Sequence, residues 1–151
     1  MKRLFLSATL IATLAALAVP AYGQGAGQGD TDAGVAAHRV ALDLAGAFTN
    51  DGFKLRDGQY SAPLKAGQAA LIQVNLYAGN QYWFSAATAD PKTMVSINLY
   101  DETGKLVKTD PYTNANRAAA GFAPEASGPY YIRIADAAGA DATYCLIYSY
   151  K

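Results

Sequence analysis

Few side chains of this chain belong to the types that perform catalysis. Its only histidine is His38 and its only cysteine is Cys145. A Ser-His-Asp or Cys-His site would have to use His38, and no serine stands in a Gly-x-Ser-x-Gly turn. The neighbours of Cys145 are Tyr, Thr, Leu and Ile, whereas a reactive thiol needs exposure and positive charge nearby. We therefore expect no enzyme and no catalytic residues, with His38 solvated and Cys145 buried, an intermolecular disulfide being the alternative for Cys145.

Calcium is the metal for which the sequence offers ligands. Zinc is excluded because the chain has no HExxH motif and no cluster of cysteines and histidines. Several aspartates fall at predicted strand ends or in loops, where their oxygens suit a calcium ion that takes six to eight ligands. Our candidate ligands are Asp101, Asp110 and Asp136. The adjacent Asp101 and Glu102 are also a possible pair of carboxylates of the glycosidase kind, but acidic residues in hairpins usually serve turn chemistry, which is the reading we prefer for them.

Aromatic side chains are the best candidates for ligand binding. The chain has 11 tyrosines and one tryptophan, and a flat row of aromatic rings can stack on sugar rings. We expect such a strip on an outward face, formed by Tyr77, Trp83, Tyr100 and Tyr131 beside Ile147. The alternative is that an N-terminal helix covers this face, because large exposed apolar patches are rare unless they are used.

Two-residue periodicity dominates the chain after Phe53 and predicts short β-strands. The predicted segments are Phe53–Tyr60, Ala70–Tyr77, Gln81–Thr88, Met94–Asp101, Lys105–Thr109, Arg117–Ala123, Tyr130–Asp136 and Thr143–Tyr150. Eight strands separated by Gly, Pro and Asn turns are typical of an antiparallel β-sandwich. We therefore predict a mainly β, jelly-roll-like sandwich within a single domain over residues 35–151.

Alternation within these segments divides the two faces of each strand. The residues expected to point into the core are Ile72, Val74, Leu76, Tyr82, Phe84, Val95, Ile97, Leu99, Phe122, Tyr130, Ile132, Ile134, Tyr144, Leu146 and Tyr148. Before the strands, Val40, Leu44 and Phe48 recur at spacing four and predict one amphipathic helix over about residues 33–48. Val40, Leu42 and Leu44 also alternate, so a strand is the alternative there, but the Ala content and the stop signal Asn50-Asp51-Gly52 favour the helix.

The N-terminus predicts export. Lys2 and Arg3 precede the apolar run Leu4–Val19, which is shorter than the roughly 20 residues that span a bilayer. This pattern predicts a signal peptide over residues 1–23, with a second possible cleavage point after Ala21. The alternative is a membrane anchor or a buried first helix. We expect a periplasmic or extracellular protein whose mature chain is not inserted in a membrane.

Two further features of the sequence bear on possible binding partners. They are the segment after the signal peptide and the net charge of the mature chain. Residues 24–34 are rich in glycine and predict a flexible leader. Loss of Lys2 and Arg3 leaves ten basic against twelve acidic residues, so nothing attracts nucleic acid electrostatically. The oligomeric state is left open by the sequence.

Several motifs occur together in the order of one known family. They are Tyr77-Ala78-Gly79-Asn80-Gln81-Tyr82-Trp83-Phe84, the hairpin from Ile97 to Leu106, Gly128-Pro129-Tyr130-Tyr131-Ile132-Arg133-Ile134, and the closing Tyr144-Cys145-Leu146-Ile147-Tyr148. Over about 90 residues the chain resembles the bacterial pre-peptidase C-terminal domain. The resemblance implies a jelly-roll-like sandwich that assists secretion or binds an insoluble polymer, with calcium in some members. This chain departs from the family's usual context because no peptidase is attached and a helix precedes the sandwich.

Taken together, these patterns predict a non-catalytic exported module that binds a polymer, either a polysaccharide or an extracellular protein. The alternative is a structural or assembly protein of the cell envelope that acts through a protein partner, using an edge strand or the helix. An enzyme ranks last because the residues for it are missing.

Overall fold

The structure is a computed structural model that describes residues 31–151. The predicted signal peptide, residues 1–23, and residues 24–30 of the predicted leader lie outside the described residues. Among residues 31–151, no helix is both long enough and apolar enough to cross a membrane.

The predicted N-terminal helix is present as α1, Asp32–Gly46. Thr31 caps it, because its side-chain oxygen accepts a hydrogen bond from the Gly34 N–H at 3.1 Å. The helix therefore begins within the segment predicted as leader, and Asp32–Gly34 form its first turn. It ends two residues before Phe48 and is followed by a short 3₁₀ turn, η1, Thr49–Asp51.

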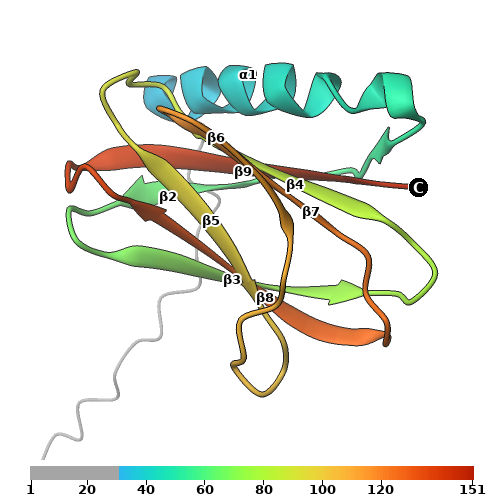
Figure 1. Ribbon diagram of the computed structural model, residues 1–151. Coiled ribbons are helices and arrows are strands. Elements are labelled where there is room, and N and C mark those ends of the chain that lie inside the picture. The colour runs from blue at the N-terminus through green and yellow to red at the C-terminus, as the bar shows by residue number, and fades with distance from the viewer. Residues whose placement is uncertain (1–30) are drawn as a thin grey trace, which may run out of the picture.

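Nine strands follow the helix and form two antiparallel sheets (Figure 1). They are β1 Lys54–Leu55, β2 Tyr60–Leu64, β3 Ala69–Leu76, β4 Tyr82–Thr88, β5 Val95–Tyr100, β6 Asp110–Asn114, β7 Arg117–Phe122, β8 Gly128–Asp136 and β9 Ala142–Tyr150. The larger sheet has the order β1-β9-β4-β7-β6, and β2 also pairs with β9. The smaller sheet has the order β3-β8-β5. The predicted mainly β sandwich is thereby confirmed.

The strand boundaries differ from the prediction in three places. The predicted strand Phe53–Tyr60 is reduced to the two residues of β1, and β2 follows as a separate strand. The predicted strand Lys105–Thr109 is a connection whose one bridge joins Leu106 to Tyr100. The next strand is instead β6, which starts one residue before Pro111, one of the prolines expected in the turns between strands. An edge strand tolerates proline because one side of its backbone needs no partner.

The core lies between the two sheets and contains the residues predicted from alternation. Phe84, Leu76, Leu99, Ile132, Ile134, Leu146 and Val95 are its largest fully buried side chains. Ile97 and Phe122 are only partly buried. Ile97 lies on β5, an edge strand of the smaller sheet, and Phe122 is the last residue of β7. Small residues that the pattern did not single out, among them Ala118 and Ala120, complete the core on β7. Their size lets the two sheets approach closely at this strand.

Helix α1 lies across the outer face of the larger sheet, over β4 and β9 (Figure 1). Its buried residues Ala37, Ala41 and Ala45 form a second apolar cluster with Ala87, Cys145 and Ile147 of the sheet. Within residues 31–151, no helix covers the outer face of the smaller sheet. The fold therefore has one covered face and one face open to solvent.

Candidate functional site

Trp83 is separated from the other predicted binding residues because it lies on the face that the helix covers. Its indole ring stacks on the ring of Phe48, with 4.1 Å between ring centroids and 8° between the planes. The indole also packs against Gly121, where an added Cβ would lie 2.9 Å from Cζ2 of the ring. Both contacts use the flat surface that a sugar ring would need.

Ile147 lies under the same helix and is buried. The expected single strip of Tyr77, Trp83, Tyr100 and Tyr131 is therefore not formed. The alternative raised from the sequence was that the helix covers the aromatic residues. This holds for Trp83 and Ile147 alone.

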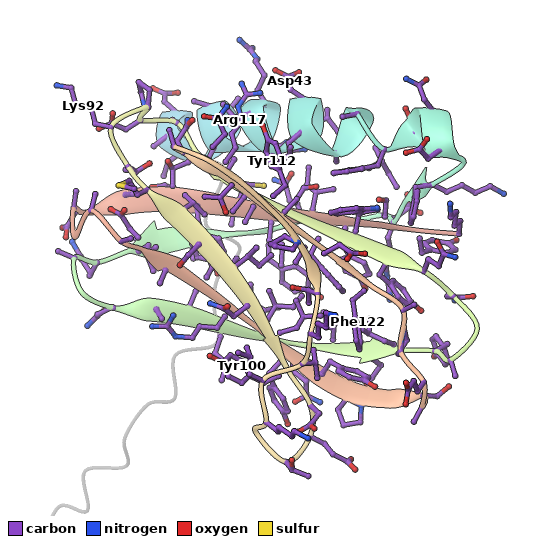
Figure 2. All side chains as sticks on the ribbon, in the orientation of Figure 1. Asp43, Lys92, Tyr100, Tyr112, Arg117 and Phe122 are labelled. Carbon is purple, nitrogen blue, oxygen red and sulfur yellow. The ribbon has the colours of Figure 1, made fainter. Side chains whose placement is uncertain are left out.

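Tyr100 and Tyr131 lie on the outer face of the smaller sheet, on neighbouring strands. They are register partners on β5 and β8, and Gln73 of β3 is the partner of Tyr131 on its other side. Figure 2 shows Tyr100 on the side of the molecule away from α1, which carries Asp43. One row across three strands thus reads Gln73, Tyr131, Tyr100.

The next row of the same face combines one leucine with two polar residues. It contains Leu71, Arg133 and Asn98, again as register partners across β3, β8 and β5. We call the two rows, Gln73-Tyr131-Tyr100 and Leu71-Arg133-Asn98, the open face. Within residues 31–151, the side chains of Gln73, Asn98 and Arg133 make no hydrogen bond or ion pair. Their donors and acceptors are therefore free to bind a ligand.

Tyr77 lies at the border of the open face. It directly follows β3, and its side chain is 61% exposed. Its backbone N–H donates a hydrogen bond to the hydroxyl of Tyr82 at 3.0 Å, which fixes the backbone at this corner. Three of the four predicted aromatic residues thus lie on the side of the smaller sheet.

The three candidate calcium ligands are not brought together. Asp136 is the register partner of Val95 at the start of β5, whereas Asp101 follows the other end of that strand and Asp110 begins β6 in the other sheet. No group of three or more His, Cys, Asp or Glu side chains in residues 31–151 is placed to share a metal ion. The expected convergence of these aspartates is therefore wrong.

Asp136 and Asp101 bind backbone groups instead. The carboxylate of Asp136 accepts hydrogen bonds from the N–H groups of Met94, Ala138 and Ala140 at 2.8, 2.9 and 3.1 Å. Burial acts to raise the pKa of Asp136, but these three donors outweigh it and lower the pKa. Each carboxylate serves a turn, the role that the sequence suggested for Asp101.

Asp101 serves the turn that follows β5. Its Oδ1 accepts from the Thr103 side chain and from the backbone N–H groups of Thr103 and Lys105. The Thr103 hydroxyl contributes most to the lowered pKa of Asp101, followed by the Lys105 N–H. These bonds shape the start of the connection between the two sheets.

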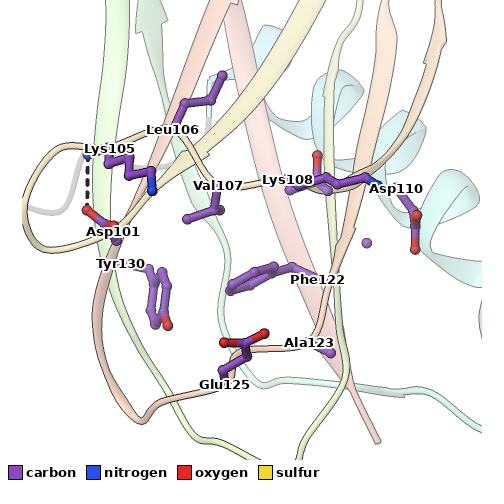
Figure 3. Close-up of a pocket in the computed structure, with 12 residues that line it drawn as sticks. Asp101, Lys105, Leu106, Val107, Lys108, Asp110, Phe122, Ala123, Glu125 and Tyr130 are labelled. Atoms are coloured by element: carbon purple, nitrogen blue, oxygen red, sulfur yellow. Dashed lines mark hydrogen bonds between the residues drawn. The ribbon is translucent and has the colours of Figure 1, made fainter.

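A cavity of about 640 Å³ opens at the end of the sandwich where this connection crosses from β5 to β6 (Figure 3). We call it the end pocket. It is lined by Asp101, Lys105, Leu106, Val107, Lys108, Thr109, Asp110, Gly121, Phe122, Ala123, Glu125 and Tyr130. The sequence pattern placed Phe122 and Tyr130 in the core. It gave no sign of the cavity, because the cavity depends on the path of the loop above them.

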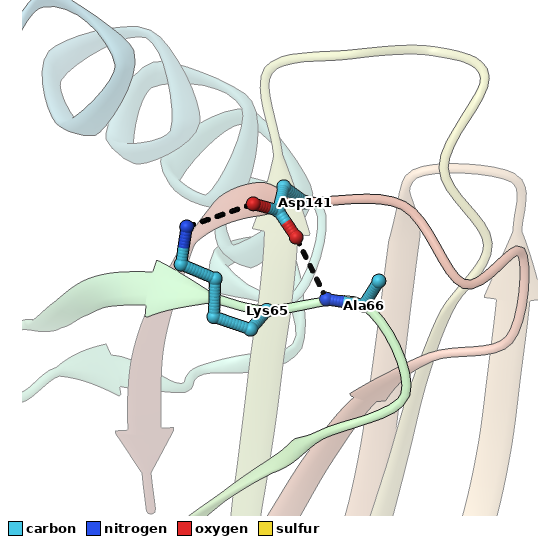
Figure 4. Close-up of polar contacts among 3 residues, drawn as sticks. All are labelled: Lys65, Ala66 and Asp141. Carbon is cyan, nitrogen blue, oxygen red and sulfur yellow. Dashed lines mark hydrogen bonds and ion pairs between the residues drawn. The ribbon is translucent and has the colours of Figure 1, made fainter.

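A second polar contact joins two loops far apart in the sequence. Lys65 Nζ lies 2.8 Å from Asp141 Oδ2, and Asp141 Oδ1 accepts from the Ala66 N–H at 2.9 Å (Figure 4). The Lys65 ammonium is the first cause of the lowered pKa of Asp141. Both side chains are well exposed, so this pair ties the β2–β3 turn to the start of β9 without forming a site.

Comparison with known proteins gives a likeness in structure. No family model matches the chain, and no curated protein matches it. A solved structure of the pre-peptidase C-terminal domain of a collagenase from Bacillus anthracis matches it with a TM-score of 0.47 and 18% sequence identity. The match covers 60% of this chain and 87% of that domain. The solved domain belongs to the family that the sequence motifs resemble.

Proposed function

We propose that the protein is an exported, non-catalytic module that binds a polysaccharide through the open face. The observation that carries the proposal is the adjacent pair Tyr100 and Tyr131, flanked by the unpaired side chains of Gln73, Asn98 and Arg133. A sugar ring presents an apolar face bordered by hydroxyl groups. Tyrosine rings can stack on the apolar face, and amide and guanidinium groups can form hydrogen bonds with the hydroxyl groups.

The geometry of the sheet supports an extended ligand. Neighbouring strands lie about 4.8 Å apart, so two tyrosines in register offer a platform wider than one ring. Gln73 and Asn98 lie on the two outer strands of the platform, where each can reach a ligand that crosses the sheet. Leu71, 64% exposed, extends the apolar part of the surface.

The test is retention of the purified mature protein on insoluble polysaccharides, among them cellulose, chitin and peptidoglycan. We expect Tyr131→Ala and Tyr100→Ala each to lower the retention constant at least about fivefold, equivalent to about 1 kcal/mol of lost stacking. Tyr112→Ala is the matched control, because Tyr112 is an exposed tyrosine on β6 of the other sheet. Circular dichroism should show all three variants folded.

Equal retention of the wild type and both open-face variants on every polysaccharide would refute the proposal. Stable capture of an envelope protein in such a case would favour the alternative role in envelope assembly. Export is tested separately, by cell fractionation and by the mass of the mature N-terminus. We expect a start at Gln24, the residue after the predicted signal peptide.

A further inference from the structure

The end pocket is independent of the open face although adjacent residues of β8 contribute to the two. Tyr131 points outward, whereas Tyr130 points inward and lines the pocket. The Tyr130 ring meets the Phe122 ring edge to face, with 5.2 Å between centroids and 63° between planes. With Val107, these two rings give the pocket an apolar floor (Figure 3).

Carboxylates surround this floor. Asp101, Asp110 and Glu125 line the pocket, and Glu102 follows Asp101 directly. Burial raises the pKa of the Tyr130 hydroxyl, and the negative charges of Asp101, Glu102 and Glu125 raise it further. Three acidic side chains thus act together on the Tyr130 end of the pocket.

Glu125 is available to a ligand. Its carboxylate makes no hydrogen bond or ion pair within residues 31–151. Figure 3 shows it beside Phe122 and Tyr130, across the pocket from Lys105 and Lys108, which lie on the opposite rim. Neither lysine forms an ion pair with it, because the one ion pair of the described residues joins Lys65 and Asp141. The Glu125 carboxylate thus lies next to two aromatic rings without an ion-pair partner, and three carboxylates against two lysines leave the lining of the pocket net negative.

We propose that the end pocket binds an organic cation, a primary ammonium or guanidinium group on a short aliphatic chain. The aliphatic part packs on Val107 and Phe122, and the cation lies between the aromatic rings and the Glu125 carboxylate. The volume of about 640 Å³ is within the range of small-molecule sites, roughly 300–1,000 Å³. This inference does not depend on the polysaccharide proposal, because it uses a different face of β8.

The test is titration of the ¹⁵N-labelled mature protein with 1,5-diaminopentane, followed by NMR. Two probes of the same length serve as comparison, the neutral 1,5-pentanediol and the anionic glutarate. We expect saturable shifts of the backbone amides of Phe122, Glu125 and Tyr130 with the diamine alone. The affinity should fall as salt is raised, because the interaction is between charges.

Two variants remove one negative charge each. Comparing them distinguishes the effect of the Glu125 charge in the pocket from the effect of the protein's net charge. Glu125→Gln should weaken diamine binding about tenfold. Asp43→Asn, on the exposed face of α1, should change it less than twofold. Tyr131→Ala should leave diamine binding unchanged, which keeps this result distinct from that of the open face. Equal binding of the diol, equal effects of the two charge variants, or the absence of saturable shifts would each overturn the proposal.

Discussion

The Asp136 carboxylate should be one of the main polar contributors to the stability of the sandwich. It is 7% exposed and holds together the backbone before β5 and the turn between β8 and β9. In Asp136→Asn, the amide oxygen can keep the two bonds from Met94 and Ala138. The new NH₂ group then faces the Ala140 N–H, donor against donor, so the third bond is lost.

The magnitude follows from the number of bonds lost. A hydrogen bond to a charged group contributes about 1.5–3 kcal/mol, so Asp136→Asn should lower the free energy of unfolding by about 2–3 kcal/mol. Asp136→Ala removes all three bonds but leaves two N–H groups, those of Ala138 and Ala140, in an exposed turn where water can replace the carboxylate. We therefore expect about 3–4 kcal/mol for this variant, a large share of the margin of a small domain.

Urea denaturation at several pH values tests this reasoning. The pKa of Asp136 is lower in the folded state than its ordinary value of 3.8, so the unfolded state binds the proton more readily. Its contribution is therefore fully present above the ordinary pKa and is lost as the pH falls through the lowered pKa. The stability difference between the wild type and Asp136→Asn should shrink as the solution is acidified below about pH 4.

Asp141→Asn is the matched control for this experiment, because it changes an exposed turn carboxylate that water can replace. It should destabilise the protein much less than Asp136→Asn. A difference of less than about 0.5 kcal/mol between Asp136→Asn and the wild type at pH 7 would show that the three N–H groups find equivalent partners without the charge.

Three further variants test the packing against Trp83 on the outer face of the larger sheet, in the core and on the open face. Gly121→Ala should cost about 1–3 kcal/mol, because its Cβ would lie 2.9 Å from the Trp83 ring, and the change in Trp83 emission on the same sample reports the displaced indole. An unshifted emission spectrum with unchanged stability would contradict that contact. Leu99→Ala, at a fully buried position between the sheets, should cost about 2–5 kcal/mol, whereas Leu71→Ala on the open face should stay within about 0.5 kcal/mol in the same urea titration. Equal costs for the two leucines would contradict the assignment of inner and outer faces.

The interior of the sandwich was predictable because alternation is a local property. Phe84 is buried and Trp83 is not in the core, as period two requires, and the same holds for Ile132 and Arg133 on β8. The pattern failed at β6, an edge strand that buries neither face. All five residues of β6 are exposed, so the strand shows no alternation of apolar and polar residues. Pro111 is a further reason why the sequence did not indicate a strand there.

The candidate sites were less predictable because they depend on which sheet each strand joins. Periodicity indicates that Trp83 and Tyr131 both point away from the core, but it does not say that they leave opposite sides of the molecule. The helix could be recognised from Leu44 and Phe48, whereas its choice of the larger sheet depends on the small residues that line that face, such as Ala87 and Cys145. The end pocket depends on the course of a nine-residue connection, residues 101–109, that carries little pattern of its own.

The position of β9 sets the order in which the larger sheet can assemble. This strand pairs with β1, β2 and β4, so β1 and β2 have no strand partner until residues 142–150 are present, and β4 until then pairs with β7 alone. A chain that emerges from its N-terminal end, whether from a ribosome or through a translocation pore, therefore cannot complete this sheet early. Such long-range pairing slows folding. The larger sheet therefore stays incomplete, and the chain stays able to pass through a pore in an unfolded form, until β9 is available.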